Sequence, residues 1–429
     1  MQQSSDRNGS FLDTFTQFYI VFVALSYNIE IVSRLLLFLI GIALLTLLIV
    51  KRVIDNRVFN VYKIDLWWFL FILIFIFNRD PNYADFATYF VFLGLIAMYV
   101  FRDNTKGYKG LFYAILLFTT INFIFNLISI FSPSLFDTLT NTLKISKFID
   151  DYSSLTGLFS DIGRNAYAAI AGFSVAFSLL LGKYKRHRIF LWSFAISMVF
   201  VVILTGKLGH SVFLITSILL LYTYLEKSFV KRLRNITLII VVLFLVIGGL
   251  ALLFPEAGSV VNRTLAKLID GDISSGRFNL WKISLDLFLE NPLFGIGYGG
   301  FTVNSLDYTG IAIYAGVHND YIQWLTETGI TGFTVNIVIL IASFTASLKM
   351  YAVLNKQNIG YTFSKTIIIW SIFFQSFVIF YSVSGIPHFS YEINTIYLLA
   401  CGVPFSVLNN LKNSRFENTP LLKIRFINK

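Results

Sequence analysis

Runs of about twenty apolar residues recur along this chain and restrict its fold more than any other feature. A helix needs about 20 largely apolar residues to cross the hydrocarbon core, where every backbone N–H and C=O group must be satisfied within the protein. Such runs lie at 11–29, 31–50, 62–78, 83–101, 108–132, 163–182, 189–205, 211–226, 236–254, 328–349, 363–383 and 393–411. The sequence therefore predicts an all-α, polytopic membrane protein with about 12 transmembrane helices, forming a single transmembrane domain over residues 1–429.

The composition supports a lipid environment. Hydrophobic residues make up 56% of the chain and charged residues 13%, whereas soluble domains carry roughly a quarter charged residues. The single cysteine, Cys401, excludes an intramolecular disulfide and a Cys-based metal site. Because no cluster of His, Asp and Glu has metal-ligand spacing, we expect no catalytic metal.

The distribution of Lys and Arg predicts the orientation, because cytoplasmic loops hold the positive charge. With the N-terminus inside, most of the 34 Lys and Arg residues fall in inner segments, and the short outer loops are nearly bare. Both termini are then cytoplasmic. The net charge of +11 reflects topology and does not indicate nucleic-acid binding.

This orientation places one large polar loop, residues 255–327, outside the membrane, and we expect the chemistry of the protein there. Within the loop, residues 277–290 are predicted to form an amphipathic helix, which lies on the membrane surface or packs on the bundle. Its apolar residues recur at helical spacing: Phe278, Trp281, Leu285 and Phe288.

Arg277 is predicted to lie in the first turn of this helix, which Ser274 or Ser275 would cap. The N–H groups of a first turn lack intrahelical partners, and a guanidinium beside them makes a good diphosphate site. In the alternative interpretation, Arg277 stacks on Trp281 or reaches lipid headgroups.

His318 is predicted to open a second helical stretch, which runs towards the tenth span. A helix N-terminus disfavours the imidazolium, so this side chain should be neutral near pH 7 and able to act as a general base. In the alternative interpretation, His318 merely caps the helix or bonds a neighbour.

The glycine cluster from Gly295 to Gly300 does not indicate a nucleotide site. It follows no predicted strand and lacks the lysine of a P-loop. We expect tight turns that bring the backbone close to a ligand or to another loop.

Other polar side chains are expected at the outer ends of spans. Charges there need water, a partner or an anion, and Lys207 could instead reach lipid headgroups. His388, in the last outer loop, is expected to be structural. The remaining members of this outer group are Asp161, Arg164, Asn165 and His210.

Three blocks of the loop together resemble the O-antigen ligase and polymerase superfamily, bacterial membrane enzymes that finish surface polysaccharides. The blocks are Ser275–Trp281, Asn291–Phe301 and His318–Ile330. The segment 161–165 is similar to one that precedes a mid-chain span in this family. The segment 204–209 is similar to its Ser-Arg-Gly stretch, although Lys207 stands where Arg is usual and the Ser is absent.

The resemblance implies a GT-C-like glycosyltransferase whose donor is an oligosaccharide on undecaprenyl diphosphate. A sugar hydroxyl attacks the anomeric carbon, the lipid diphosphate leaves, and neither a metal nor a cofactor is needed. His318 would be the base and Arg277 the main cation. Candidate substrate-binding residues are Arg164, Asn165, Lys207, Arg263, Trp281, Asn319, Asp320 and Tyr321.

The same resemblance implies a multi-pass protein of the bacterial cytoplasmic (inner) membrane. Its partners would be the lipid-linked donor, an acceptor glycan and membrane lipid, with a chain-length regulator and a flippase as further candidates. No nucleic acid is expected.

Three functions remain open. A polymerase that joins repeat units of an O-antigen, capsule or exopolysaccharide is favoured over a ligase that moves a finished glycan to a lipid or protein acceptor. A lipid-linked-oligosaccharide flippase or other transporter is less favoured, because such proteins hold charges near the bilayer midplane and often contain inverted repeats. A purely structural scaffold would leave the neutral histidine and the helix-start arginine unexplained.

Overall fold

The structure is a computed structural model, and it describes most of the chain. The described residues are 2–26, 29, 33–55, 60–81, 87–102, 105–145, 155–159, 161–182, 187–226, 228–234, 237, 241, 276–309, 316–356 and 363–416. Their regular secondary structure is helical, apart from an isolated bridge between Arg79 and Tyr298. The all-α prediction is confirmed for this part of the chain.

Each predicted apolar run within the described residues coincides with a helix. By length and composition, seven helical segments could cross a membrane, and four shorter apolar ones accompany them. The run 236–254 lies largely outside the described residues, so the predicted count of twelve is not tested. The helices are α1 (Gln2–Leu25), α2 (Arg34–Ile54), α3 (Ile64–Phe77), α4 (Ala87–Phe101), α5 (Tyr108–Phe131), α7 (Ile162–Leu181), α8 (Arg188–Leu204), α9 (Leu208–Leu225), α15 (Asp320–Lys356), α16 (Phe363–Tyr381) and α17 (Tyr391–Phe416).

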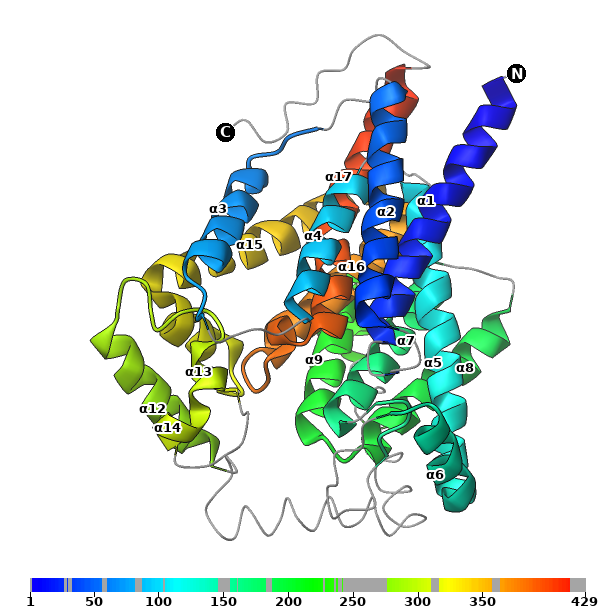
Figure 1. Cartoon of the computed structure of the whole chain (residues 1–429). Helices are drawn as coiled ribbons and strands as arrows, with labels where there is room; N and C mark the ends of the chain where they lie inside the picture. The colour runs from blue at the N-terminus through cyan, green and yellow to red at the C-terminus, as the bar shows by residue number, and fades with distance from the viewer. Residues whose placement is uncertain are drawn as a thin grey trace.

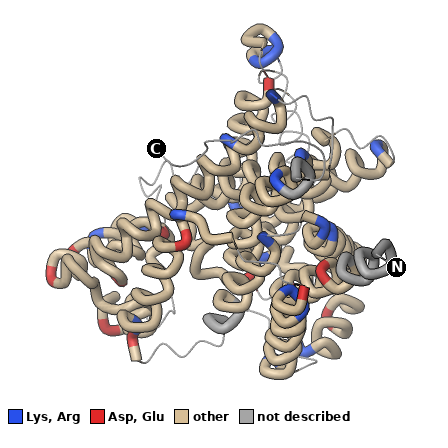
Figure 2. Tube along the Cα trace, turned by 90° about the horizontal axis from the view of Figure 1, so that it is seen from above, with Lys and Arg blue, Asp and Glu red and all other residues tan. Residues whose placement is uncertain are grey.

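The helices form a bundle in which the start of α1 and the end of α17 lie at the same end (Figure 1). The centre is built from α7, α16 and α17, and the most apolar window of α17 is 94% buried. The corresponding window of α2 is only 22% buried, so this helix presents apolar side chains outward. Charged residues are spread thinly along the tube (Figure 2). This distribution suits a bundle surrounded by lipid.

Hydrogen bonds between polar side chains join the central helices, because the hydrophobic effect does not drive helices together within lipid. The hydroxyl groups of Ser347 and Ser371 lie 3.0 Å apart, and Gln375 Nε2 donates to Ser347 Oγ at 2.9 Å. Ser371 Oγ donates to the carbonyl of Ala400 at 2.7 Å. Because lipid is as apolar as the side chains, such bonds and close packing hold α15, α16 and α17 together.

Short helices lie outside the apolar segments. They are η1 (Thr105–Gly107), α6 (Pro133–Thr142), α12 (Arg277–Glu290), α13 (Gly300–Val303), α14 (Ser305–Thr309) and η2 (Pro387–Phe389). The bounds of α12 agree with the prediction, and the helix packs on α15. Gly276, with φ 79°, occupies the N-cap position of α12, and capping by the predicted serines is not tested. Ser274 and Ser275 lie outside the described residues.

A sharp kink at Gly329 (φ 61°, ψ −170°) divides α15. The chain after α12 satisfies the backbone groups that the kink releases, because Ile330 N donates to Pro292 O at 2.9 Å and Thr331 N donates to Leu293 O at 3.3 Å. A Cβ at Gly329 would lie 2.4 Å from Leu293 O. Glycine at this position therefore permits the close approach of the loop to α15.

The glycine cluster completes the same junction. Ile296 N donates to Thr326 O at 3.0 Å, and a Cβ on Gly295 would lie 2.4 Å from that oxygen. Gly299 N donates to the buried carboxylate of Glu327 at 2.8 Å. The prediction that these glycines bring backbone close to another part of the chain is confirmed.

Candidate functional site

Three helices that are distant in sequence, α9, α12 and α15, begin around the turn 382–385, which follows α16. Arg277 Nη1, at the start of α12, donates to Ser384 O at 3.0 Å. A Cβ on Gly209, at the start of α9, would lie 3.2 Å from Ser384 Oγ. Asp320, at the start of α15, donates its backbone N–H to Ser382 O at 2.9 Å. The turn therefore brings three helix N-termini together.

His318 has an unusual backbone conformation, with φ 56° in the left-handed region. Such a conformation costs about 1–3 kcal/mol for a residue other than glycine and persists only where the surroundings enforce it. Here Val317 N donates to Gln323 Oε1 at 3.1 Å, and Val317 O accepts from Trp281 Nε1 at 3.1 Å. These bonds hold the segment before His318 from both sides.

The interpretation in which His318 caps the helix is wrong. The helix begins at Asp320, and the N–H of Ile322 donates to the side chain of Asn319 at 3.1 Å. Asn319 Nδ2 also donates to Val383 O at 3.0 Å. Asn319 therefore caps α15 and binds the neighbouring turn, which leaves the imidazole of His318 free of that role.

The imidazole of His318 is neutral at pH 7. Burial, followed by the positive charges of Arg277 and Lys207, lowers the pKa of His318 to about 4, whereas Asp161 acts in the opposite direction. The sequence predicts this neutrality from the helix terminus, but burial is the main cause. The electrostatic interactions also place three predicted outer-face residues, Arg277, Lys207 and Asp161, around one imidazole.

Arg277 does not stack on Trp281 in the described structure. Its guanidinium bonds to Ser384 O, and the indole of Trp281 bonds to Val317 O. Neither Gly276 before α12 nor Lys207 before α9 makes a side-chain cap. The starts of both helices, where the positive end of each helix dipole lies, are therefore close to two cations.

Asp320 is fully buried and ties the start of α15 to the chain that follows α16. Its Oδ2 accepts from Ser382 Oγ at 2.8 Å and lies 2.7 Å from His388 Nδ1. Tyr321, the next residue, donates its hydroxyl to Ile379 O at 2.7 Å. Both side chains therefore have protein partners, and their direct contact with a substrate stays a prediction.

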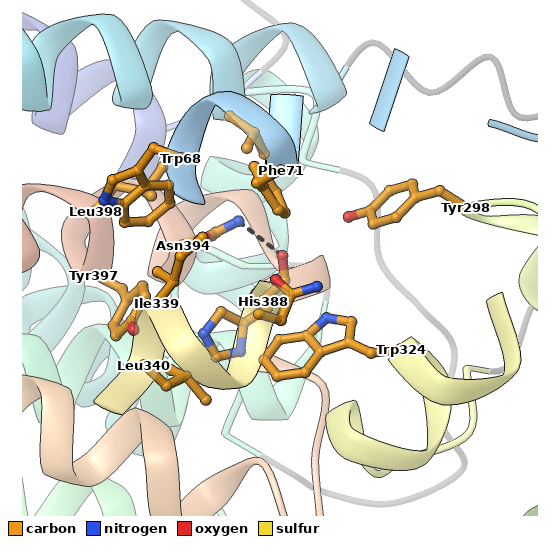
Figure 3. A pocket seen from close by; sticks show the side chains of 12 residues that line it. Trp68, Phe71, Tyr298, Trp324, Ile339, Leu340, His388, Asn394, Tyr397 and Leu398 are labelled. Atoms are coloured by element: carbon orange, nitrogen blue, oxygen red, sulfur yellow. Dashed lines mark hydrogen bonds between the residues drawn. The ribbon is translucent and has the colours of Figure 1, made fainter. Parts of the chain in front are cut away.

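His388 lines a small pocket between α3, α15 and α17 (Figure 3). Its ring lies between those of Trp324 and Tyr397, at centroid distances of 4.7 Å and 4.8 Å. Asn394 Nδ2 donates to its carbonyl at 2.8 Å. The pairing of His388 with Asp320 gives it the structural role that the sequence suggests. Its partner was not foreseeable, because the two residues are 68 positions apart.

Arg164 faces the start of α17 in the described structure. Its Nε lies 3.5 Å from the buried carboxylate of Glu392, and its Cζ lies 5.5 Å from the ring centre of Tyr391. The backbone N–H of Arg164 donates to the carboxylate of Asp161, the N-cap of α7, at 3.0 Å. Glu392 is a member of this region that the sequence interpretation missed.

Asn165 lies in a buried network of three asparagines. Its Oδ1 accepts from Asn122 Nδ2 at 2.7 Å, and its Nδ2 donates to Asn126 Oδ1 at 2.9 Å and to Leu155 O at 2.8 Å. The network holds the segment 155–159 against α5 and α7. A contact of Asn165 with substrate stays a prediction, and Arg263 lies outside the described residues.

His210 is a second histidine near the same cations. Its ring lies between those of Tyr167 and Tyr381, at centroid distances of 4.7 Å and 4.4 Å. This residue is buried at the start of α9, where the sequence predicts only an outer-face polar side chain. Aromatic packing therefore accounts for its position.

Comparison with known proteins gives one family. Residues 193–337, from α8 to the second half of α15, match the family described as O-Antigen ligase, and this segment contains Arg277 and His318. No curated protein sequence matches the chain. The chain therefore carries a domain of the O-antigen ligase and polymerase superfamily.

Proposed function

We propose that this protein is a polysaccharide polymerase of the bacterial cytoplasmic membrane. It transfers a glycan from undecaprenyl diphosphate to a sugar hydroxyl of an acceptor repeat unit at the outer face, with both termini in the cytoplasm. The observation that carries the proposal is the turn 382–385, which bonds both to Arg277 and to the start of α15, shortly after His318. Burial and the charges of Arg277 and Lys207 keep the imidazole of His318 neutral. A neutral base beside cations is what glycosyl transfer from a diphosphate requires.

The leaving diphosphate binds at the starts of α9 and α12. Negative charge develops on the bridging oxygen as the glycosidic bond breaks. Arg277 and Lys207 stabilise this charge, and the dipoles of both helices, whose N-termini lie here, add to the stabilisation. In this mechanism the two cations take the place that a metal ion has in other diphosphate-dependent transferases.

His318 accepts the proton of the attacking hydroxyl. In the empty site the two cations oppose protonation of the imidazole. A bound diphosphate offsets their charge and so raises the basicity of His318 when the donor is present. By reciprocity, a protonated His318 favours the diphosphate, which links proton uptake to departure of the leaving group.

A ligase that moves a finished glycan is the alternative, and the description of the matched family favours it. Both reactions use the same donor and base, so the acceptor alone separates them. Silver-stained gels of surface polysaccharide from a deletion strain distinguish the two. A polymerase defect leaves one repeat unit on the acceptor, whereas a ligase defect leaves long lipid-linked chains. An unchanged ladder contradicts both functions.

Replacement of His318 by Ala should lower the transfer rate by about 10²–10⁴-fold, because the base is lost. Polymer formation is measured with lipid-linked donor in membranes that contain equal amounts of protein. His187→Ala is the matched control, since His187 shares the left-handed backbone (φ 65°) but precedes α8. Normal polymer in the His318 variant removes it as the base.

Replacement of Arg277 by Lys should lower kcat/KM by about tenfold or more, because a planar, multidentate contact with phosphate is lost although the charge remains. The control is Arg188→Lys, which alters another arginine at the first position of a helix. Wild-type turnover in the Arg277 variant would show that charge alone suffices at this position.

The pH dependence of kcat/KM should report the pKa of the general base in the free enzyme. A base works only when unprotonated, so activity should fall on the acid side with a midpoint near pH 4, well below the ordinary histidine value of 6.5. Lys207→Ala removes one of the charges that lower this pKa, so its midpoint should move towards higher pH. If the midpoint of the wild type is near pH 6.5 and does not shift in Lys207→Ala, the proposed placement of these cations near His318 is contradicted.

A further inference from the structure

The surface of α12 that does not face the protein is divided into two stripes. Ser284 is buried and its carbonyl accepts from Thr326 Oγ1 at 3.0 Å, which fixes the side that packs on α15. Phe278, Leu285 and Leu289 form an apolar stripe, and each is between 40% and 70% exposed.

The second stripe is polar and equally exposed. Its members are Asn279, Asp286 and Glu290. At about 100° per residue, the centres of the two stripes are separated by roughly 100° around the helix axis. One side of α12 therefore contacts the protein, one is apolar, and one is acidic.

The apolar stripe continues onto the outer ends of two membrane helices. Leu293 and Phe294 are exposed directly after α12. Phe294 O accepts from the side chain of Asn78, which follows the exposed Phe77 at the end of α3. Pro292 O accepts from Ile330, an exposed residue at the kink where the apolar part of α15 begins. Figure 1 shows α12 beside α15, at the end of the bundle towards which α3 runs.

We propose that the apolar stripe of α12 lies in the outer leaflet of the membrane, so that α12 is an interfacial helix. An apolar patch of this extent is unusual in contact with water, and this one is continuous with surfaces that face lipid. Lys282 lies between the two stripes, nearer to the apolar one, where its long side chain reaches phosphate headgroups. The acidic stripe, turned away, faces water. This division is typical of helices that lie in the membrane interface.

The arrangement places Arg277, the first residue of α12, at the level of the lipid headgroups. A lipid-linked diphosphate lies at that level, so membrane contact would orient the cation towards it. This consequence rests on the proposed function, whereas the membrane contact of α12 does not. The test below therefore needs no enzymatic activity.

The single cysteine of the chain, Cys401, is buried, so an added surface cysteine can be labelled selectively. We would compare Leu289→Cys with Asp286→Cys, which lie on the apolar and acidic stripes. Each variant carries an environment-sensitive fluorophore and is placed in nanodiscs of zwitterionic and anionic phospholipid. The unsubstituted protein reports background labelling, and Leu285→Cys provides a second position on the apolar stripe.

The label at Leu289→Cys should lose several-fold more fluorescence to spin-labelled lipid than to aqueous iodide, and Asp286→Cys should show the reverse. Equal access of iodide to both positions overturns the proposal. Shielding of the label at Leu289→Cys from both quenchers, together with disulfide formation between unlabelled copies of this variant, also overturns it and indicates a protein partner. If the quenching is as expected but a deletion strain shows an unchanged polysaccharide ladder, the membrane contact stands and the proposed function fails.

Discussion

One buried carboxylate, that of Asp320, joins the two halves of the candidate site. It accepts a hydrogen bond from Ser382 and pairs with His388, which fixes the turn 382–385 against the start of α15. The same turn provides Ser384 O, to which Arg277 is bound. Burial of a carboxylate is costly unless partners compensate, so this network is stable only when the whole arrangement is assembled. Arg277 and His318 are consequently positioned together.

Several local features of the candidate site are energetically unfavourable compared with an ordinary junction of helices. His318 occupies a left-handed backbone conformation, and α9 and α12 begin without side-chain caps. Two cations, Arg277 and Lys207, lie near those helix starts, whose dipoles are unfavourable for positive charge. In the proposed function, a bound anion offsets the charge of the two cations and interacts favourably with both helix dipoles. Departures from local rules of this kind are typical of functional sites.

The sequence predicts the helices well because the membrane leaves few alternatives to a long apolar helix. Periodicity and Pro292 likewise predict the bounds of α12. The pairings of Asp320 with His388 and of Arg164 with Glu392 could not be predicted, because they join side chains far apart in sequence. The kink at Gly329 also leaves no mark on the apolar pattern, since only the neighbouring loop makes glycine necessary there.

His318 is held more rigidly than Arg277, and the tasks proposed for the two side chains explain the difference. Val317, next to His318, is bonded to the fully buried Gln323, which donates in turn to Glu327 at 3.1 Å. Arg277 belongs to α12, in which Ser284 is the one buried residue. A general base must lie within hydrogen-bond reach of its proton. Attraction between a cation and a diphosphate falls only as the inverse of distance. In the proposed function, α12 can therefore adjust to the donor while His318, as the base, stays fixed in the bundle.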